Sequence, residues 1–465
     1  MVLASMDPSL AWGVILFLGV VWVGLGYYWG RKADSSEGFM LAGRKIGLAL
    51  GSATVMATWV TSNTVMLAPK FAYTMGVWGV LAYSTASFGL FLFAPIALRI
   101  RRILPAGVTA GDFFRMKYGT TGWVFFMIIT LTYSMAWLVT MAIAGGELLN
   151  ALTGISYHHG MSFILLVCVL YTLFGGLYAV VGTDFVQSLI ILFGVVLIGV
   201  LVLGQVDLAG VHHHLEREQP MLLQGFMPVA LLSFFNIMLF GFGEVFHNNV
   251  WWSRTFAMRE GVAPKAFLLS GFLWFPIPVA AGFIALSANS LEINVTEANQ
   301  VGPLVADHVL ASAGLGAAAG VLILVVLFCS IASSIDSLLA ATSDLVLKDV
   351  WQTATGDNLP EATLRRWAAV VIIGLGLVAW GLALQRLPLE EVLYASGPLV
   401  ASLIWPVIAG IFWQRVNVPV VLAGVVLAVV TGLYAYSEAW YIGCLASAGV
   451  SMVVTLAGRW IPKFR

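Results

Sequence analysis

The chain has 465 residues, of which 60% are hydrophobic and only 9% are charged. Soluble domains carry roughly 25% charged residues, so this composition excludes a soluble globular protein. The formal net charge is zero, and no basic stripe with interleaved aromatic residues indicates a nucleic-acid partner. Cys168, Cys329 and Cys444 lie far apart in apolar segments, a pattern that predicts neither a disulfide framework nor a metal site.

Apolar runs of about 20 residues, the length that a helix needs to cross a lipid bilayer, recur along the whole chain. The first run follows acidic Asp7 and has no basic stretch before it, which predicts a true span rather than a cleaved signal peptide. We predict thirteen spans and a single integral membrane domain over residues 1–465. In chain order they are 10–29, 46–69, 76–98, 121–149, 160–182, 185–204, 224–252, 264–287, 316–347, 367–385, 391–413, 417–436 and 438–458.

The basic residues are distributed as the positive-inside rule requires for these spans. With the N-terminus outside, only Lys70, Arg217 and Arg386 fall in outer segments. The prediction is therefore an extracellular N-terminus and a cytoplasmic C-terminus in the inner or plasma membrane. The basic residues expected on the cytoplasmic side are Arg31, Lys32, Arg44, Lys45, Arg99, Arg101, Arg102, Arg115, Lys117, Arg254, Arg259, Lys265, Lys348, Arg365, Arg366, Arg415, Arg459, Lys463 and Arg465.

Two predicted spans carry signals of an interrupted helix. SATVMATWVTSNTVMLAPK (52–70) is rich in β-branched and polar residues, and FNIMLFGFGEVFHNNVWWSR (235–254) has two glycines followed by several polar residues. Non-helical backbone at membrane depth persists only where it is buried in protein or lines a watery cavity. If the first span is set aside, these segments become spans 1 and 6 of a ten-span core, which is typical of inverted-repeat transporters with a midplane site. For each segment alone, a kinked helix is the alternative.

Hydroxyl groups gather on one face of the predicted span 316–347. Within CSIASSIDSLLAATSD (329–344), the serines recur at helical spacing, and Asp336 lies at the edge of their face. An ionisable residue at membrane depth usually marks an ion or substrate path, and hydroxyl and carbonyl oxygens beside a carboxylate suit a small hard cation. The alternative is that small residues allow close helix packing.

A second acid, Asp184, follows a glycine pair and Thr183 in GGLYAVVGTDFVQSL (175–189). Its position predicts either a cap for the helix that begins there or a second cation ligand. The sequence contains no nucleophile–base arrangement and no metal quartet that would predict an enzyme.

Three motifs carry a resemblance that covers essentially the whole chain: LAGRKIG (41–47), GGLYAVVGTDFVQ (175–187) and SSIDSLLAATSDLVLKDVW (333–351). The chain resembles the sodium:solute symporter family. That resemblance implies an all-α polytopic membrane protein of about thirteen transmembrane helices, as a monomer or homodimer. Its leucine-transporter-like core, a 5+5 inverted repeat, would span 45–414, with one extra helix in 1–44 and two in 415–465.

The resemblance also implies that Na⁺ is the coupling ion, bound between core spans 1 and 8. Carried over by residue, the ligands are the carbonyls of Ala57, Val60 and Ser330 and the hydroxyls of Ser333 and Ser334. A second sodium position found in some members corresponds to Asp184, Ser333, Asp336 and Ser337. A proton-coupled symporter of the same fold is the alternative, with Asp184, Glu244 or Asp336 as the proton carrier.

Within the family, segments such as YTMGVWGVLAYSTASFGLFLFA (73–94) and SGFLWFPIP (270–278) are similar to the urea active transporters. Asn248 and Asn249 depart from that subgroup, which commonly has Asp-Gln there, and Asp336 stands where it usually lacks an acid. The expected function is Na⁺-coupled uptake of a small polar solute, with urea or an amide favoured; a channel-like facilitator or a sensor is the alternative. The expected solute-binding residues are Trp59, Thr61, Thr64, Tyr83, Tyr133, Trp137, Glu244 and Asn248.

Overall fold

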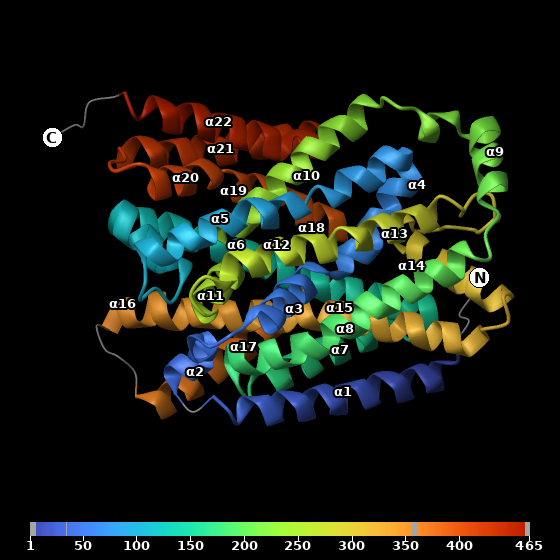
Figure 1. The fold of residues 1–465 in the computed structure, drawn as a ribbon, viewed down its shortest axis with the longest axis horizontal. Helices are drawn as coiled ribbons and strands as arrows, with labels where there is room; N and C mark the ends of the chain where they lie inside the picture. Colours follow the sequence, from blue (N-terminus) through green and yellow to red (C-terminus); the bar gives the residue numbers. More distant parts are fainter. Residues whose placement is uncertain (1–5, 34, 356–359, 461–465) are drawn as a thin grey trace.

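The computed structural model describes residues 6–33, 35–355 and 360–460. These residues form helices and no strand; a single isolated bridge joins Ile46 and Met258. The long helices run roughly along one axis, and α1 (Pro8–Gly30) begins at the end of the bundle opposite to the one where α22 (Gly443–Ala457) finishes (Figure 1). A chain that runs along the bundle an odd number of times must begin and finish at opposite ends of it. The all-α prediction is confirmed.

The core helices follow the predicted spans in order, and several spans are built from two or three helices. They are α3 (Leu48–Trp59) with α4 (Ser62–Ser84), α5 (Ser87–Ile103), α6 (Ala110–Thr153), α7 (Tyr157–Thr172), α8 (Gly176–Leu203), α10 (Pro228–His247) with α11 (Asn249–Ala257), α12 (Val262–Trp274) with α13 (Pro276–Ala285), α15 (Gly316–Leu345), α17 (Glu361–Ala383), and α18 (Leu389–Ala395) with α19 (Gly397–Ala401) and α20 (Ile404–Phe412). The chain continues into α21 (Val418–Glu438) and α22. The shorter connecting helices are α2 (Ser36–Leu41), α9 (Leu208–Glu218), α14 (Val301–Ser312) and α16 (Gln352–Thr355).

By length and composition, 11 helical stretches in the described residues could cross a membrane, against the thirteen predicted spans. Two differences account for this. The predicted span 160–182 is the 16-residue helix α7, which is too short to count. The predicted span 46–69 is divided between the short α3 and the beginning of a continuous stretch, Ser62–Ile103.

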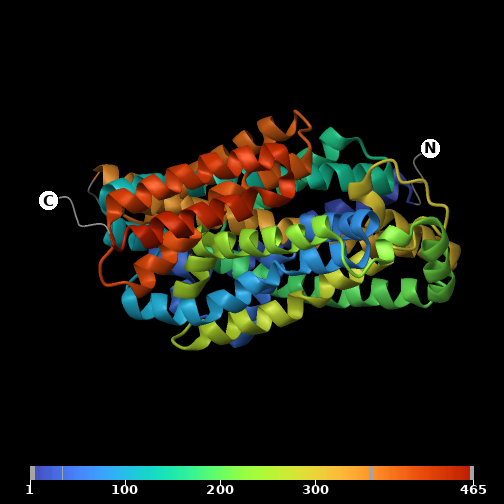
Figure 2. The ribbon, with the colours of Figure 1, turned by 90° about the horizontal axis from the view of Figure 1, so that it is seen from above.

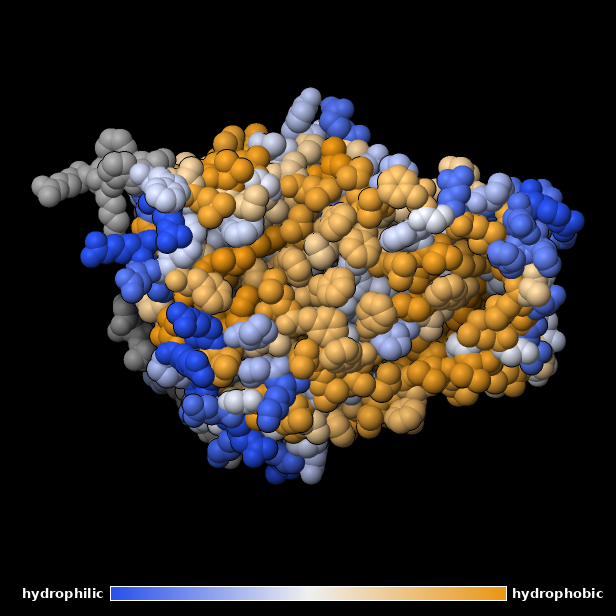
Figure 3. Space-filling view, turned by 45° about the horizontal axis from the view of Figure 1, so that its top comes forward, coloured by the Kyte–Doolittle hydropathy of each residue, from blue (hydrophilic) through white to orange (hydrophobic). Residues whose placement is uncertain are grey.

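The surface separates into an apolar belt and two polar ends, as Figure 3 shows. Large apolar side chains on the outer helices point away from the protein: Phe17 of α1 is 66% exposed and Phe193 of α8 is 69% exposed. Such continuous exposure of apolar surface would be unfavourable in water and suits contact with lipid. The chain is therefore an integral membrane protein. The helices added to the core lie at its margins, with α1 along one edge and the packed pair α21 and α22 along the other (Figures 1 and 2).

Both predicted interruptions are present, and both lie within the segments that carried the polar signals. The first is at Val60, which has the extended angles φ −82° and ψ 90° between α3 and α4. The second is at Asn248, with φ −74° and ψ 126° between α10 and α11. Pro69, by contrast, lies inside α4.

The glycines of the second interrupted segment serve close packing inside an unbroken helix. A Cβ atom at Gly241 would lie 2.7 Å from the carbonyl oxygen of Ala86, and one at Gly243 would lie 2.6 Å from that of Val400. These two positions let α10 approach the α5 and α19 segments closely. Gly241 and Gly243 therefore indicate close packing between helices, not an interruption of α10.

The turn between α7 and α8 lies earlier than predicted. α7 ends at Thr172 and α8 begins at Gly176, which has a left-handed φ of +52°. Asp184 consequently lies inside α8, and the interpretation of Asp184 as a helix cap is wrong. The Thr-Asp pair has the chemistry of a cap, but the glycine pair supplies the backbone freedom that the turn requires.

We expect Gly76→Ala to lower the stability of the protein more than Gly154→Ala does. Both glycines have a left-handed φ, +65° and +70°, which costs an alanine roughly 1–2 kcal/mol. A Cβ at Gly76 would also lie 1.9 Å from the carbonyl oxygen of Leu222, whereas one at Gly154 would meet nothing within 4 Å. Overpacking should add about 1–3 kcal/mol. Unfolding of both purified variants in detergent measures this, and equal losses would contradict the packing argument.

Candidate functional site

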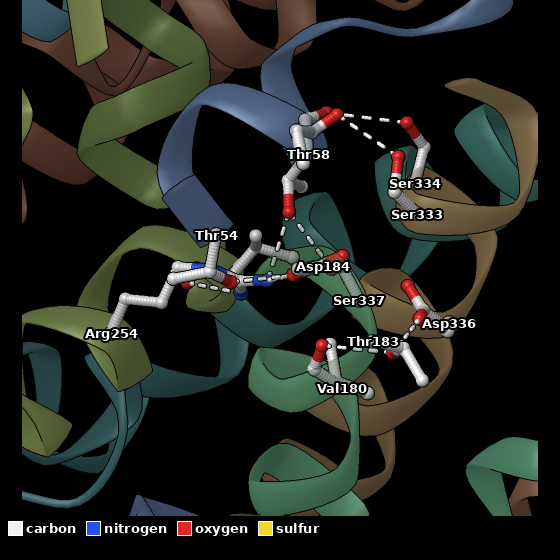
Figure 4. A network of polar contacts seen from close by, with 12 residues as sticks. Thr54, Thr58, Val180, Thr183, Asp184, Arg254, Ser333, Ser334, Asp336 and Ser337 are labelled. Carbon is white, nitrogen blue, oxygen red and sulfur yellow. Dashed lines mark hydrogen bonds and ion pairs between the residues drawn. The ribbon is translucent and has the colours of Figure 1, made fainter. Parts of the chain in front are cut away.

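A cluster of oxygen atoms joins the end of α3 to the middle of α15. The hydroxyl of Ser333 donates to the carbonyl of Ala57 at 3.0 Å, and that of Ser334 donates to the carbonyl of Thr58 at 3.2 Å (Figure 4). Both hydroxyls also lie within 3.3 Å of the carbonyl oxygen of Ser330. All these residues are fully buried. We call Ala57, Thr58, Ser330, Ser333 and Ser334 the oxygen cluster.

The break after α3 explains why these carbonyls are available. A helix leaves the carbonyls of its last turn without intrahelical partners, and α3 ends at Trp59. The structure thus brings together four of the five residues of the predicted sodium site, and Val60 lies at the adjacent break. An all-oxygen set suits a hard monovalent or divalent cation. The assignment of Na⁺ to this cluster stays a prediction.

Beside the cluster, the Arg254 guanidinium from α11 joins three other helices. Its Nη2 donates to the Thr58 hydroxyl at 2.9 Å, to Asp184 Oδ2 at 3.2 Å and to the Ser337 hydroxyl at 2.6 Å (Figure 4). Its Nε donates to the hydroxyl of Thr54 at 3.1 Å, and this hydroxyl donates in turn to Asp184 Oδ2 at 2.5 Å. Arg254 therefore links α11 to α3, α8 and α15 in the centre of the bundle.

The location of Arg254 corrects the charge count made from the sequence. The positive-inside argument placed it in a cytoplasmic segment, but its side chain is fully buried. The sequence predicts that the residues WWSR (251–254) end a span and begin a basic loop. In the structure, helix α11 continues through them to Ala257. The carboxylate that compensates Arg254 comes from α8, 70 residues away in the chain, so no local pattern could indicate the pair.

Asp336 is the second carboxylate of this region. The Thr183 hydroxyl lies 3.4 Å from its Oδ2, while the Oδ1 atoms of Asp336 and Asp184 have no hydrogen-bond partner among the described residues. Two buried carboxylates therefore accompany one guanidinium, an arrangement that accepts one further positive charge. Of the predicted second sodium position, Asp184 and Ser337 already bond to Arg254. That second position stays a prediction.

A cavity of about 60 Å³ lies within the bundle beside both helix breaks. Its walls come from α3, α4, α6, α10, α12 and α18 and from residues at the breaks. The side chains are mostly aromatic, with a few polar groups, as expected for a small-solute pocket. The lining residues are Trp59, Thr61, Asn63, Tyr83, Ala86, Tyr133, Trp137, Ile237, Phe240, Glu244, Trp274, Leu393 and Tyr394.

Six of the eight predicted solute-binding residues line this cavity, whereas Thr64 and Asn248 do not. The Thr64 hydroxyl accepts from the backbone N–H of Thr61 at 3.3 Å, and Asn248 Oδ1 accepts from the N–H of Val250 at 3.0 Å. Each of the two residues caps the helix that restarts after a break. They shape the site without lining it.

Sequence reasoning missed seven lining residues. Trp274 donates through its indole N–H to the carbonyl of Trp59 at 2.9 Å, so it braces the end of α3 as well as lining the cavity. Tyr394 lies in a span with no polar face that would have singled it out. The other missed residues are Asn63, Ala86, Ile237, Phe240 and Leu393.

The pattern of the sodium:solute symporter family matches residues 39–428, and the chain belongs to this family. Its fold is similar to that of a Na⁺-coupled sialic acid symporter, with a TM-score of 0.81 over 98% of both chains at 15% identity. It is also similar to Mhp1, a nucleobase-cation-symport-1 family transporter, with a TM-score of 0.56 over 92% of this chain and 95% of the other at 17% identity. These likenesses confirm the predicted fold class.

Relatives in sequence are also transporters. The urea-proton symporter DUR3 of Oryza sativa subsp. japonica is 26% identical over 89% of this chain, which spans only 62% of the rice protein. The urea active transporter of Saccharomyces cerevisiae is 23% identical over 92% of this chain and 63% of its own length. The sodium/pantothenate symporter of Escherichia coli is 27% identical over 92% of this chain and 90% of its own. The prediction of a transporter rather than an enzyme is confirmed by these relatives.

Proposed function

We propose that the chain is a secondary active symporter of the plasma membrane, with its N-terminus outside. It couples the inward movement of a cation, with Na⁺ favoured, to uptake of a small polar solute of the urea or amide type. One observation carries the proposal: the break between α3 and α4 serves two sites at once. Trp59 lines the cavity, while the preceding carbonyls of Ala57 and Thr58 accept from Ser333 and Ser334 of α15.

This geometry provides a physical route for coupling. A cation at the oxygen cluster would take the place of the two hydroxyl–carbonyl hydrogen bonds and hold α3 against α15. Because Trp59 follows these carbonyls directly, holding the end of α3 also fixes one wall of the cavity. Ion and solute then favour the same conformation, and each shifts the equilibrium by its differential affinity for the two states. We assign this movement to the ten-helix core, 45–414.

We assign the outer closure of the cavity to a contact between α4 and α18. Lys70 forms an ion pair with Glu390. Lys70 follows the lining residue Asn63 by two turns of α4, and Glu390 precedes the lining residue Tyr394 by one turn of α18. In the proposed cycle this pair separates when solute enters from outside.

Proton coupling is the second candidate, and Asp336 favours it. This buried carboxylate has no cation bonded directly to it, its Oδ1 has no hydrogen-bond partner among the described residues, and it lies in a region that accepts one more positive charge. The name of the rice relative, a urea-proton symporter, points in the same direction. The oxygen cluster favours Na⁺, and the sodium/pantothenate symporter of Escherichia coli supports that assignment.

Uptake into proteoliposomes tests the proposed function. The solutes are urea, short amides, amino acids and monocarboxylates, each under an inward Na⁺ gradient, an inward proton gradient, or neither. We expect accumulation above the external concentration with Na⁺, lost when an ionophore removes the gradient. Accumulation driven by the proton gradient alone would select the second candidate. Equilibration without accumulation under every gradient would indicate a channel-like facilitator and would overturn the proposal.

A further inference from the structure

The solute cavity contains polar atoms that the protein leaves unbonded. Glu244 is 2% exposed; its Oε1 accepts from the indole N–H of Trp251 at 3.0 Å, while its Oε2, with the side chains of Tyr133 and Asn248 close by, has no partner in hydrogen-bonding geometry among the described residues. The amide oxygen of Asn63 and the hydroxyl of Tyr394 are likewise buried and unbonded. Because buried polar atoms nearly always have partners, the oxygens of Glu244 and Asn63, which only accept, point to a ligand that brings hydrogen-bond donors, while the Tyr394 hydroxyl can donate or accept.

Among the described residues, the only ionisable charge in the cavity wall is negative. Its lining residues include one carboxylate, that of Glu244, and no lysine, arginine or histidine. The guanidinium of Arg254 is bonded to Asp184 and the neighbouring hydroxyls. A buried carboxylate without a paired cation is costly, whereas a positively charged solute would supply the pairing. An anionic solute would find no counter-charge in the wall.

The aromatic walls favour the same class of ligand. Seven lining residues are aromatic, and their rings are held by mutual contacts: Trp59 and Trp274 have centroids 6.5 Å apart, and Tyr83 and Trp274 have centroids 6.2 Å apart. Aromatic faces attract cations within about 6 Å of the ring centroid, and more strongly where water is excluded. A carboxylate within an aromatic enclosure therefore fits an organic cation.

The volume limits the size of that cation. One water needs roughly 10–15 Å³ of such space, so about 60 Å³ admits four to six water-sized groups. A flat cation of that size has N–H groups in one plane, and it can donate to Glu244 while its faces meet the rings. A sugar or an amino acid with a large side chain exceeds this space.

We propose that this cavity selects a small planar organic cation of the guanidinium or amidinium class, with Glu244 as its counter-ion, over neutral amides and carboxylates. The proposal rests on the proposed function, because it takes the cavity as the solute site. It keeps the small planar shape of the proposed solute and replaces a neutral urea-like molecule by a positively charged relative of that shape. Glu244 is then the residue that decides the charge of the solute.

Competition and binding measurements with Glu244→Gln test the proposal. In wild-type proteoliposomes, guanidinium, methylguanidine and acetamidine should compete for the solute site at least about tenfold better than urea and acetamide, the gain expected from a charge-assisted hydrogen bond. Glu244→Gln keeps the shape and removes the charge, so this preference should disappear. Glu218→Gln, on the exposed face of α9, is the matched control and should behave like the wild type.

Calorimetric titration of the same ligands into detergent-purified protein gives a readout that does not depend on transport. Neutral amides that accumulate and bind as tightly as the cations would overturn the selectivity while leaving the proposed function intact. Unchanged cation affinity in Glu244→Gln would overturn the role of Glu244. Cations that bind in a Glu244-dependent way without gradient-driven accumulation of any solute would support the selectivity and contradict the proposed function. If none of the cations binds to the wild-type protein, the proposed selectivity for planar cations is wrong.

Discussion

Replacing Ser333 and Ser334 together by alanine is expected to weaken the apparent affinity for Na⁺ by at least about tenfold. The two hydroxyls face the carbonyls of Ala57 and Thr58 across the α3–α15 contact. Losing two oxygen ligands should cost a cation at least the equivalent of one charged hydrogen bond, about 1.5–3 kcal/mol. The measurement is the Na⁺ concentration that gives half-maximal solute uptake in proteoliposomes.

Ser330→Ala is the matched control for this double variant. The Ser330 hydroxyl donates to the carbonyl of Val326 within α15 at 2.8 Å, while its own carbonyl is the group that faces the oxygen cluster. This substitution removes a hydroxyl from the same helix and leaves the expected ligands in place, so the Na⁺ dependence should stay close to that of the wild type. An unchanged Na⁺ dependence in the double variant, with solute uptake retained, would show that the ion binds elsewhere.

Arg254→Gln is expected to destabilise the protein by about 3–5 kcal/mol, the usual cost of removing one partner of a buried ion pair. The pair between Arg254 and Asp184 is fully buried, with a separation of 3.2 Å. Removing the guanidinium leaves the carboxylate without compensation in a region that already contains Asp336. It also removes the bonds from α11 to the hydroxyls of Thr58 on α3 and Ser337 on α15, while the bond from Asn249 to the carbonyl of Ala341 on α15 remains.

A double-mutant cycle separates this ion pair from general loss of packing. Asp184→Asn combined with Arg254→Gln should recover much of the loss, because the uncompensated charge is gone. The control pair is Asp349→Asn with Arg254→Gln: Asp349 accepts from Thr109 and Trp123 and not from Arg254, so the destabilisation by Asp349→Asn should add to the destabilisation by Arg254→Gln. Unfolding in detergent gives all these values. A first double variant as unstable as the sum of its single variants would refute the ion-pair account.

The hydroxyl face of α15 shows what a periodic pattern can predict. The serines recur at helical spacing, and a helix of that length in an apolar chain has to lie in the membrane. Their common face and their burial therefore followed from the sequence. The carbonyls that they meet did not, because which residues of α3 face α15 depends on where α3 stops. That end point, at Trp59, is a property of the packed bundle.

The solute cavity shows the same division. Trp59, Tyr83 and Glu244 stood out as aromatic or polar residues within apolar spans, and they line the cavity. Trp274 and Tyr394 are aromatic residues of predicted spans as well, but only the approach of α12 and α18 brings them to the same space. Contacts between helices far apart in the chain leave no periodic trace in either helix.

The sequence by itself determined the apolar helices, their order and the hydroxyl face, since each depends on length, hydropathy and spacing along one segment. The tertiary structure alone decided the partner of Arg254, the position of Asp184 inside α8 and the exact points at which α3 and α10 stop. These features depend on contacts between packed helices, because a buried guanidinium and the free backbone groups of a helix end need partners. In a bundle of this size, that partner usually belongs to another helix.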